Sequence, residues 1–331
     1  MDFQVDITIP PLQPPVNYGD KILLTGSCFT EHIGQSLAEL KFDVLQNPNG
    51  ILFDPAAVCH SIFSWIDNRP YRESDLFSLH DIWHSWAHHS RFSHTDSART
   101  LEQINASQQQ AHNFLQQADW LIITLGSAFS YRLTKAAAAG EPGNGVANCH
   151  RAPAQWFDKH LMSIEEIVAQ LDTLYHRLKI YNPGLKILFT ISPVRHIRDG
   201  VVANNRSKAR LIESVHHICD KLEGVYYFPA YELVTDVLRD YRFYDADLVH
   251  PNYMATTYVM ERFREHCIDP SAKPLMNEIK KIVVARRHKP FHPATAAHRQ
   301  FLSAHYEKVK MLQEQYPFLQ LQEELDYFSG K

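Results

Sequence analysis

The chain has 331 residues, of which 45% are hydrophobic and 21% are charged, and its formal net charge at pH 7 is -4. This ordinary composition gives no reason to expect nucleic acid or an anionic membrane as a partner, and no run approaches the roughly 18 apolar residues of a membrane span. The five cysteines form no C-x-x-C motif and the N-terminal segment is acidic and interrupted by prolines, so we expect no disulfide framework, no zinc knuckle, no secretory signal and a cytoplasmic protein.

The first strong pattern is the segment 21–30, where a strand leads into a helix. Residues 22–24 are apolar, as in a strand buried on both faces, and apolar residues then recur at helical spacing up to residue 40. Gly26 permits a sharp turn, so Ser27 and Cys28 stand at the start of the helix. Unpaired N–H groups at that point favour a thiolate and can hold an oxyanion, which makes this pair a candidate nucleophile site. A helix-capping serine beside a buried cysteine would give the same pattern.

Three short elements follow. The sequence predicts a strand over 42–45, a loop over 46–55 and a helix over 56–68. Within the loop, Gly50 can bring its backbone N–H close to a ligand, or it can simply complete an Asn-Gly turn.

Aromatic and imidazole side chains are concentrated between residues 71 and 94, in Trp83, His84, Trp86, His88 and His89. They can form a wall beside a pocket, in which strand alternation would place Trp86 and His88 on one face and His89 on the other. A surface hairpin with packed aromatic side chains is the alternative. No carboxylate or third ligand stands at a metal-ligand spacing, so we predict no metal site.

From residue 98 onward, helical and strand patterns alternate. This order predicts parallel strands between two layers of helices, which is a three-layer α/β/α sandwich. Active sites in such sheets lie beyond the carboxyl ends of the strands, and Ser27, Cys28, Ser127, Arg195 and His196 all fall at those ends. The predicted elements are helix 98–118, strand 120–126, a mobile loop over 134–150, helix 163–181, strand 186–194, helix 204–222 and strand 225–228.

Two sequence pairs are further candidates for catalysis. Cys149 and His150 are a rival nucleophile pair, although neighbours in sequence seldom form a working dyad. Asp247 and His250 are three residues apart, so a helical turn would place both on one side and let the carboxylate orient the imidazole. A capping aspartate beside a solvent-facing histidine would have the same spacing. Pro251 suits the start of the helix that follows.

The last part of the chain, residues 266–331, has no clear strand pattern and is rich in Lys, Gln, Glu and His. Helices are predicted over 275–284 and 294–315, followed by a tail with apolar residues over 317–329. We therefore expect a catalytic domain over 1–265 and a helical extension over 266–331 that covers this domain or supports a homodimer.

Several of these motifs together resemble one family. The segment Thr25–Thr30 resembles the signature of the GSCFA family, which belongs to the SGNH/GDSL hydrolase superfamily, with Thr30 in place of the final Ala. The resemblance extends over roughly residues 15–265. Similar stretches are Asn47–Gly50, Thr124–Ala128, Asn148–His150, Ser192–His196, Asp240–Tyr244 and Asp247–Pro251.

The resemblance implies a flavodoxin-like parallel sheet and a set of site residues. It places the nucleophile at Cys28, although attack by Ser27 would move the register by one residue. His250 would act as general base and then general acid, oriented by Asp247. The backbone N–H groups of Cys28 and Gly50 would hold the oxyanion, and Gly50 matches the glycine that does so in relatives. Ser127 would be the further donor, because Ala128 stands where relatives have Asn; losing such a donor costs on the order of 10²–10³ in rate.

The activity implied is hydrolysis of an acyl or acetyl ester of a small molecule or glycan derivative, without a cofactor. The segment Trp83–His89, with His88 and His89, and the pair Arg195–His196 would shape the leaving-group side. An acyltransferase that uses the same residues is one alternative, and a non-catalytic binding protein of the same fold is another. A metal-dependent hydrolase built on His84, His88 or His89 is the third.

Overall fold

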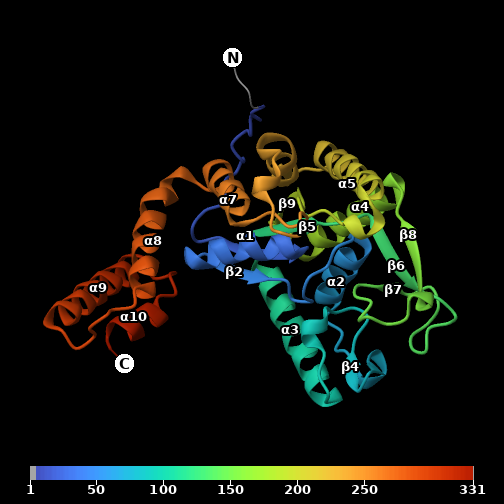
Figure 1. The fold of residues 1–331 in the computed structure, drawn as a ribbon, viewed down its shortest axis with the longest axis horizontal. Coiled ribbons are helices and arrows are strands. Elements are labelled where there is room, and N and C mark those ends of the chain that lie inside the picture. Colours follow the sequence, from blue (N-terminus) through green and yellow to red (C-terminus); the bar gives the residue numbers. More distant parts are fainter. Residues whose placement is uncertain (1–4, 331) are drawn as a thin grey trace.

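The computed structural model describes residues 5–330, and a parallel five-stranded sheet forms its centre (Figure 1). The strand order is β10-β9-β5-β1-β2, and every neighbouring pair is parallel. In chain order this is 2-1-3-4-5, so the direction of winding reverses between β1 and β5, which is where ligands bind in such sheets. The strands are β1 (Lys21–Gly26), β2 (Asp43–Gln46), β5 (Trp120–Leu125), β9 (Lys186–Ile191) and β10 (Val225–Tyr227).

The sheet is covered on both faces because successive side chains of each strand alternate between two cores. Ile22 and Leu24 belong to one core with α1 (Cys28–Glu39) and α7 (Tyr253–Cys267). Leu23 belongs to the other, which holds side chains from α2 (Pro55–Asp67), α4 (Ile164–Tyr181) and α5 (Val201–Lys221). The predicted three-layer α/β/α sandwich is therefore confirmed. The short α6 (Ala230–Glu232) continues directly into a π-helical turn over 233–238.

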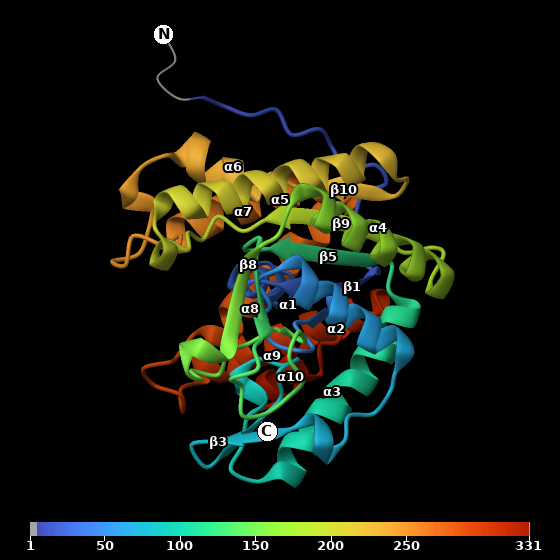
Figure 2. The ribbon, with the colours of Figure 1, turned by 90° about the vertical axis from the view of Figure 1, so that its right-hand side faces the viewer.

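Two insertions interrupt the α/β alternation, and the first is the hairpin given above as the alternative to a pocket wall. Between α2 and α3 (Ser97–Gln117) lies a hairpin of β3 (Phe77–Leu79) and β4 (Ile82–His84), and Figure 2 shows β3 and α3 at the end of the molecule opposite the N-terminus. The predicted strand alternation over Trp86–His89 is wrong, because β4 ends at His84 and a turn follows.

The second insertion is a three-stranded antiparallel sheet on the right-hand side of Figure 1. It consists of β6 (Phe129–Leu133), β7 (Gly145–Val146) and β8 (Phe157–Leu161). The expected loop over 134–150 thus contains a strand. Sequence patterns missed all three strands because their side chains are mostly half-buried or exposed, and only backbone pairing identifies them.

The C-terminal helices lie beside α1 and β2, at the left of Figure 1. They are α8 (Lys273–Arg287), α9 (Ala296–Gln315) and α10 (Gln322–Phe328), and their buried side chains belong to the same core as α1. Lys41 Nζ lies 2.8 Å from Glu324 Oε2, and Arg287 Nη2 lies 2.7 Å from Glu39 Oε1. The extension therefore covers one edge of the main sheet.

The lead-in before β1 is described from residue 5, and residues 1–4 of the predicted lead-in lie outside the described part. It packs along the end of α7, where Leu12 N and Val16 N donate to the carbonyls of His266 and Cys267, both at 2.8 Å. No helix in the described range 5–330 is both long enough and apolar enough to cross a bilayer.

Candidate functional site

The turn from β1 into α1 lies at the point where the winding of the sheet reverses. Gly26 has φ +138, and a Cβ there would lie 2.1 Å from the carbonyl oxygen of Thr124, so the close approach of β1 to β5 requires glycine. Ser27 N then donates to Thr124 O at 3.0 Å. On the β5 side, Gly126 N and Ser127 N both donate to Phe53 O, at 2.8 and 2.9 Å. Three segments therefore meet here: the β1–α1 turn, the loop before α2, and the end of β5.

Ser27 and Cys28 differ in their access to this meeting point. Ser27 is 1% exposed, and its Oγ has no hydrogen-bond partner among residues 5–330, so it stands at the N-cap of α1 without capping it. Cys28 is half-buried and begins the helix. The side chain of Ser27 therefore does not act as a helix cap. Cys28 is the more accessible of the two candidate nucleophiles.

The electrostatics of Cys28 are mixed. Burial raises the pKa of its thiol, and the carboxylate of Glu31 acts in the same direction. The N–H groups of Phe29 and Cys28 and the charge of Lys208 lower the pKa, but by less than burial raises it. The expectation that the helix start alone would make this thiol ionise easily is thus not met, because the thiol loses more hydration than the N–H groups return.

Lys208 is a buried cation that the sequence analysis did not find. It is 1% exposed, and its Nζ donates to Gly126 O and Ser192 O, both at 2.6 Å. Burial lowers the pKa of this amine to about 7, while the nearby Cys28 raises it. The sequence pattern could have indicated that Lys208 is buried, since it falls on the buried stripe of α5 that runs through Asn204 and Leu211.

Asp247 and His250 form the pair that their spacing predicted, although in a turn rather than a helix. Asp247 Oδ2 lies 2.6 Å from His250 Nδ1, and its Oδ1 accepts the N–H groups of Val249 (2.9 Å) and His250 (3.0 Å). The backbone N–H of His250, then its ring, lower the pKa of Asp247 to about 2. Arg195 N donates to Val249 O at 3.3 Å, so this turn lies beside the segment that follows β9.

His250 therefore lies on the same edge of the sheet as Cys28, but no hydrogen bond joins the two side chains among residues 5–330. The charge of His250 contributes to lowering the pKa of two other histidines on that edge, His196 and His32. Burial lowers the pKa of His196 to about 4, and the charges of Lys208 and His250 act in the same direction. Partial burial and then His250 likewise lower the pKa of His32, in α1. The imidazole of His250 itself is half-exposed.

Two of the predicted oxyanion donors, Gly50 and Ser127, are occupied. Gly50 N donates to Asn47 O at 2.7 Å, and Ser127 N donates to Phe53 O. Ser127 Oγ accepts from Phe129 N at 3.0 Å. Their oxyanion role stays a prediction, and it requires the loop before α2 to give up a hydrogen bond.

The predicted aromatic wall divides into two parts. Trp83 packs against a small core of the β3–β4 insertion, and the buried His88 holds its Nδ1 2.9 Å from Ser85 Oγ. Burial lowers the pKa of His88 to about 3, so it is a neutral core histidine. His89 differs, because a Cβ on Gly50 would lie 2.2 Å from the His89 Cβ. Only His89 of these three therefore borders the predicted oxyanion loop.

The remaining predicted substrate contacts lie after β9. The Arg195 guanidinium stands over the Tyr244 ring at 5.4 Å, and the His196 ring meets the edge of Phe53 at 5.4 Å. Phe53 supplies the carbonyl that binds the end of β5. The structure thus brings His196 to the meeting point described above, between the turn of His250 and the β1–α1 turn.

The rival pair Cys149–His150 is not arranged for catalysis. His150 Nε2 lies 2.9 Å from Ser85 O and its Nδ1 lies 3.3 Å from Ser90 Oγ, so both ring nitrogens are engaged elsewhere. Burial lowers the pKa of His150 to about 4 and raises the pKa of the Cys149 thiol to about 11. Within residues 5–330, no three His, Cys, Asp or Glu side chains are grouped in a way that could hold a metal ion.

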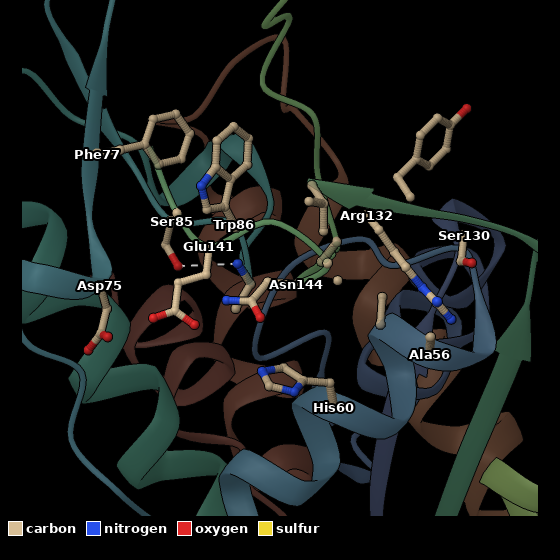
Figure 3. Close-up of a pocket in the computed structure, with 18 of the residues that line it drawn as sticks. Ala56, His60, Asp75, Phe77, Ser85, Trp86, Ser130, Arg132, Glu141 and Asn144 are labelled. Carbon is tan, nitrogen blue, oxygen red and sulfur yellow. Dashed lines mark hydrogen bonds between the residues drawn. The ribbon is translucent and has the colours of Figure 1, made fainter. Parts of the chain in front are cut away.

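A cavity of about 810 Å³ lies apart from the residues predicted for catalysis, between α2, the β3–β4 insertion and β6–β7 (Figure 3). Figure 3 shows Glu141, Asn144 and His60 near one another at one end, and Arg132 and Ser130 toward the other. None of the predicted catalytic or oxyanion residues lines it, but Trp86 of the predicted aromatic wall does, together with Ser85 and Ala87. The aromatic pattern around Trp86 was the one sign of a pocket in the sequence, because the other walls come from segments that are distant in the chain.

Comparisons with known protein families match two regions of the chain. The model described as the GSCFA family matches residues 21–263, and the model described as the GSCFA domain protein, C-terminal domain, matches residues 279–331. No curated protein matches the chain. The first region contains the sheet and both members of the Asp247–His250 pair, and the second contains most of the C-terminal helices.

Proposed function

The chain belongs to the GSCFA family, and from this premise we propose that it is an SGNH-type hydrolase that cleaves an acyl ester of a small molecule or glycan derivative. The observation that carries the proposal is the 2.6 Å hydrogen bond between Asp247 and His250, on the same edge of the sheet as Cys28. An imidazole oriented by a carboxylate is the base that a nucleophile at a helix start needs.

The proposed reaction has two halves. His250 takes the proton of the Cys28 thiol, the thiolate attacks the ester carbonyl, and the C–O bond breaks as the alcohol leaves with that proton. A water molecule then attacks the thioester and gives a proton to His250; the C–S bond breaks, the acid is released, and His250 returns the proton to the sulfur. Asp247 keeps the imidazole proton on Nδ1, so Nε2 faces the reaction.

For His250 to exchange a proton with Cys28, the turn that carries His250 has to move. This turn is largely exposed, and catalytic hydrogen bonds are often long before substrate is bound and tighten in the complex. We therefore propose that substrate binding draws His250 toward Cys28.

A non-catalytic binding protein of the same fold is the second candidate. It is favoured by one observation: the N–H groups of Gly50 and Ser127, the predicted oxyanion donors, already donate to protein carbonyls. A site that cannot free them has only the N–H of Cys28 left of the predicted donors and stabilises a tetrahedral intermediate less.

The test is hydrolysis of a panel of short-chain nitrophenyl esters by the parent chain and by Cys28→Ala, Ser27→Ala and His250→Ala. We expect Cys28→Ala and His250→Ala to lose at least about a thousand-fold in kcat/KM. Cys219→Ala, a half-buried thiol in α5, is the matched control and should keep full activity. Full activity in Cys28→Ala with loss in Ser27→Ala would move the nucleophile by one residue. No turnover of any ester by the parent would favour the binding protein.

Acyl transfer is separated from hydrolysis in the same assay. Added alcohols or sugars should leave the yield of free acid unchanged if water is the acceptor. If they divert the acyl group into a new ester, the protein is a transferase that uses the same residues.

A further inference from the structure

The cavity between α2, the β3–β4 insertion and β6–β7 contains none of the groups proposed for ester cleavage. Its walls are kept open by small residues from three segments of the chain, which are Ala56, Ala57, Ala87, Ala147, Gly140, Gly143 and Gly145. Larger side chains would fill such a space, whereas ligand pockets have volumes of about 300–1,000 Å³. At about 810 Å³ this cavity has the size of a ligand site.

One wall of the cavity, the segment 140–147, is fixed against the β3–β4 insertion. Ala147 N donates to Trp86 O at 2.8 Å. Gly140 has φ +84 and packs so closely that a Cβ there would lie 2.5 Å from Leu133 Cδ1 and 3.0 Å from Trp86 Nε1, so this position requires glycine. A wall that is held in place before a ligand arrives lowers the entropic cost of binding.

Aromatic side chains form the end of the cavity at the upper left of Figure 3. The rings of Phe77 and Trp86 are stacked, with centroids 3.7 Å apart and planes inclined by 16°, and both residues line the cavity. Trp86 Nε1 is buried and has no acceptor among residues 5–330. A buried donor without a partner is rare in proteins, and an oxygen atom of a bound molecule would supply the acceptor.

Four polar side chains of the cavity are free to bind a ligand, and Figure 3 labels them as His60, Arg132, Glu141 and Asn144. No hydrogen bond or ion pair joins any of them to another residue in the range 5–330. The Glu141 carboxylate accepts and the Arg132 guanidinium donates, while the Asn144 amide does both. His60 also does both, because burial lowers its pKa and keeps the imidazole neutral at pH 7.

This combination of groups disfavours charged and apolar ligands. An anion would meet the carboxylates of Asp54, Asp75 and Glu141, and a cation would meet the guanidinium of Arg132. An acyl chain would remove these charges from water without giving them partners, which is costly. A neutral molecule with many hydroxyl groups avoids both penalties, because each hydroxyl can donate to a carboxylate and accept from a guanidinium. In a sugar ring, C–H groups also form an apolar face that packs on aromatic rings.

We propose that this cavity is a binding site for a neutral saccharide, in which a sugar ring lies against Trp86 and its hydroxyl groups bind Glu141, Asn144 and Arg132. The inference goes beyond the proposed ester cleavage, because it uses no group of the Cys28–His250 edge. A saccharide bound here would hold the protein on a glycan whether or not the protein cleaves an ester.

The experiment screens the full chain against a printed array of defined oligosaccharides. The oligosaccharide that binds best is then titrated in solution while tryptophan fluorescence is followed. We expect a dissociation constant below about 1 mM and a change in emission, because the ligand alters the surroundings of Trp86. Trp86→Phe keeps an aromatic ring and should remove most of the change in emission.

Gly145 offers a way to close the cavity without changing its polar groups. It stands opposite Arg132 in the pairing of β6 with β7, and opposite residues of an antiparallel pair project to the same side. A Cβ on Gly145 would meet no atom within 4 Å beyond its chain neighbours. Gly145→Phe should therefore place its ring in the cavity and weaken saccharide binding at least about tenfold.

Glu141→Gln is the second variant. The Glu141 side chain is exposed and makes no contact that the fold needs, so the variant should melt at the temperature of the parent. We expect binding to weaken by about tenfold, the loss that corresponds to one hydrogen bond to a charged group. Glu102→Gln, at an exposed position of α3 outside the cavity, is the matched control and should bind as the parent does.

Two results would overturn the proposal. One is that no oligosaccharide binds above background, including the case in which choline chloride binds instead and assigns the cavity to organic cations. The other is that folded Gly145→Phe and Glu141→Gln both bind the saccharide as tightly as the parent. Cys28→Ala should keep the parent's affinity for the saccharide, so a failure of the proposed ester cleavage would leave this inference intact.

Discussion

Asp247 holds the His250 ring through one carboxylate oxygen and binds the backbone of the same turn through the other. The turn is therefore closed by the same side chain that orients the imidazole. Substituting this residue tests whether the pair is functional, because a purely structural turn would affect stability and not turnover.

We expect Asp247→Asn to lower kcat for ester hydrolysis by about 10- to 100-fold, the loss that corresponds to one charge-assisted hydrogen bond. The amide can still accept the N–H groups of Val249 and His250, so the melting temperature should stay close to that of the parent. Asp240→Asn is the matched control, since Asp240 is an exposed residue that caps another turn in the same region through Arg242 N. Equal loss of activity in both variants would argue against a specific role for Asp247.

Asp54 is a buried carboxylate whose charge destabilises the fold. It caps α2 by accepting from Ala57 N at 3.0 Å, and burial raises its pKa to about 6. The folded state therefore holds this proton more tightly than the unfolded chain, whose group has its ordinary pKa near 4. Its contribution to stability is complete below about pH 4 and is lost as the pH rises through about 6.

Asp54→Asn keeps the acceptor and removes the charge. We expect the free energy of unfolding, from urea titration at pH 8, to rise by roughly 2 to 3 kcal/mol, and the gain to shrink as the pH is lowered toward 4. Asp96→Asn, at the exposed cap of α3, should change stability by less than about 0.5 kcal/mol. A loss of stability in Asp54→Asn at pH 8 would mean that the carboxylate is needed in its charged form.

His88 should give the opposite dependence on pH. Burial lowers its pKa to about 3, so the folded state keeps it neutral while the unfolded chain binds a proton below about pH 6.5. The contribution of His88 to the free energy of unfolding is complete above pH 6.5. It falls by about 1.4 kcal/mol per pH unit as the pH is lowered toward 3. His88→Asn should reduce the slope of unfolding free energy against pH by that amount between pH 6 and pH 4. His292→Asn, at an exposed site, should leave the slope unchanged.

Glu324 joins the C-terminal helices to the main sheet. It is 1% exposed, with Arg286 Nη1 2.6 Å from its Oε1 and Lys41 Nζ 2.8 Å from its Oε2; the second contact is an ion pair without hydrogen-bond geometry. Glu324→Ala leaves Lys41 without its anion and leaves Arg286 with only the exposed Glu323, and we expect a loss of about 2 to 3 kcal/mol in unfolding free energy. Limited proteolysis should then cut faster between α8 and α9.

The control for this prediction is Glu323→Ala. Glu323 also pairs with Arg286, at 2.7 Å, but it is 72% exposed, so its loss should cost less than about 1 kcal/mol. If the two variants were equally stable, the buried pair would not be what holds the extension in place.

Local pattern determined the central fold. The strands β1, β5 and β9 are buried on both faces, so their residues form continuous apolar runs that can be recognised one segment at a time. The Asp247–His250 pair was also local, because three residues of spacing suffice for the contact. The strands of the β6–β7–β8 sheet carry no such pattern, since their side chains are largely half-buried or exposed.

Tertiary structure alone decided the chemistry around Cys28. Periodicity tells which side of α5 is buried, but it does not tell that Lys208 meets the carbonyls of Gly126 and Ser192. It does not show that Asn47 and Phe53 already accept the N–H groups of Gly50 and Ser127. The physical reason is the distance along the chain over which each property is determined. Burial of a helix face follows from the order of neighbouring residues, whereas a hydrogen bond or a shifted pKa depends on atoms that meet only when distant segments pack together.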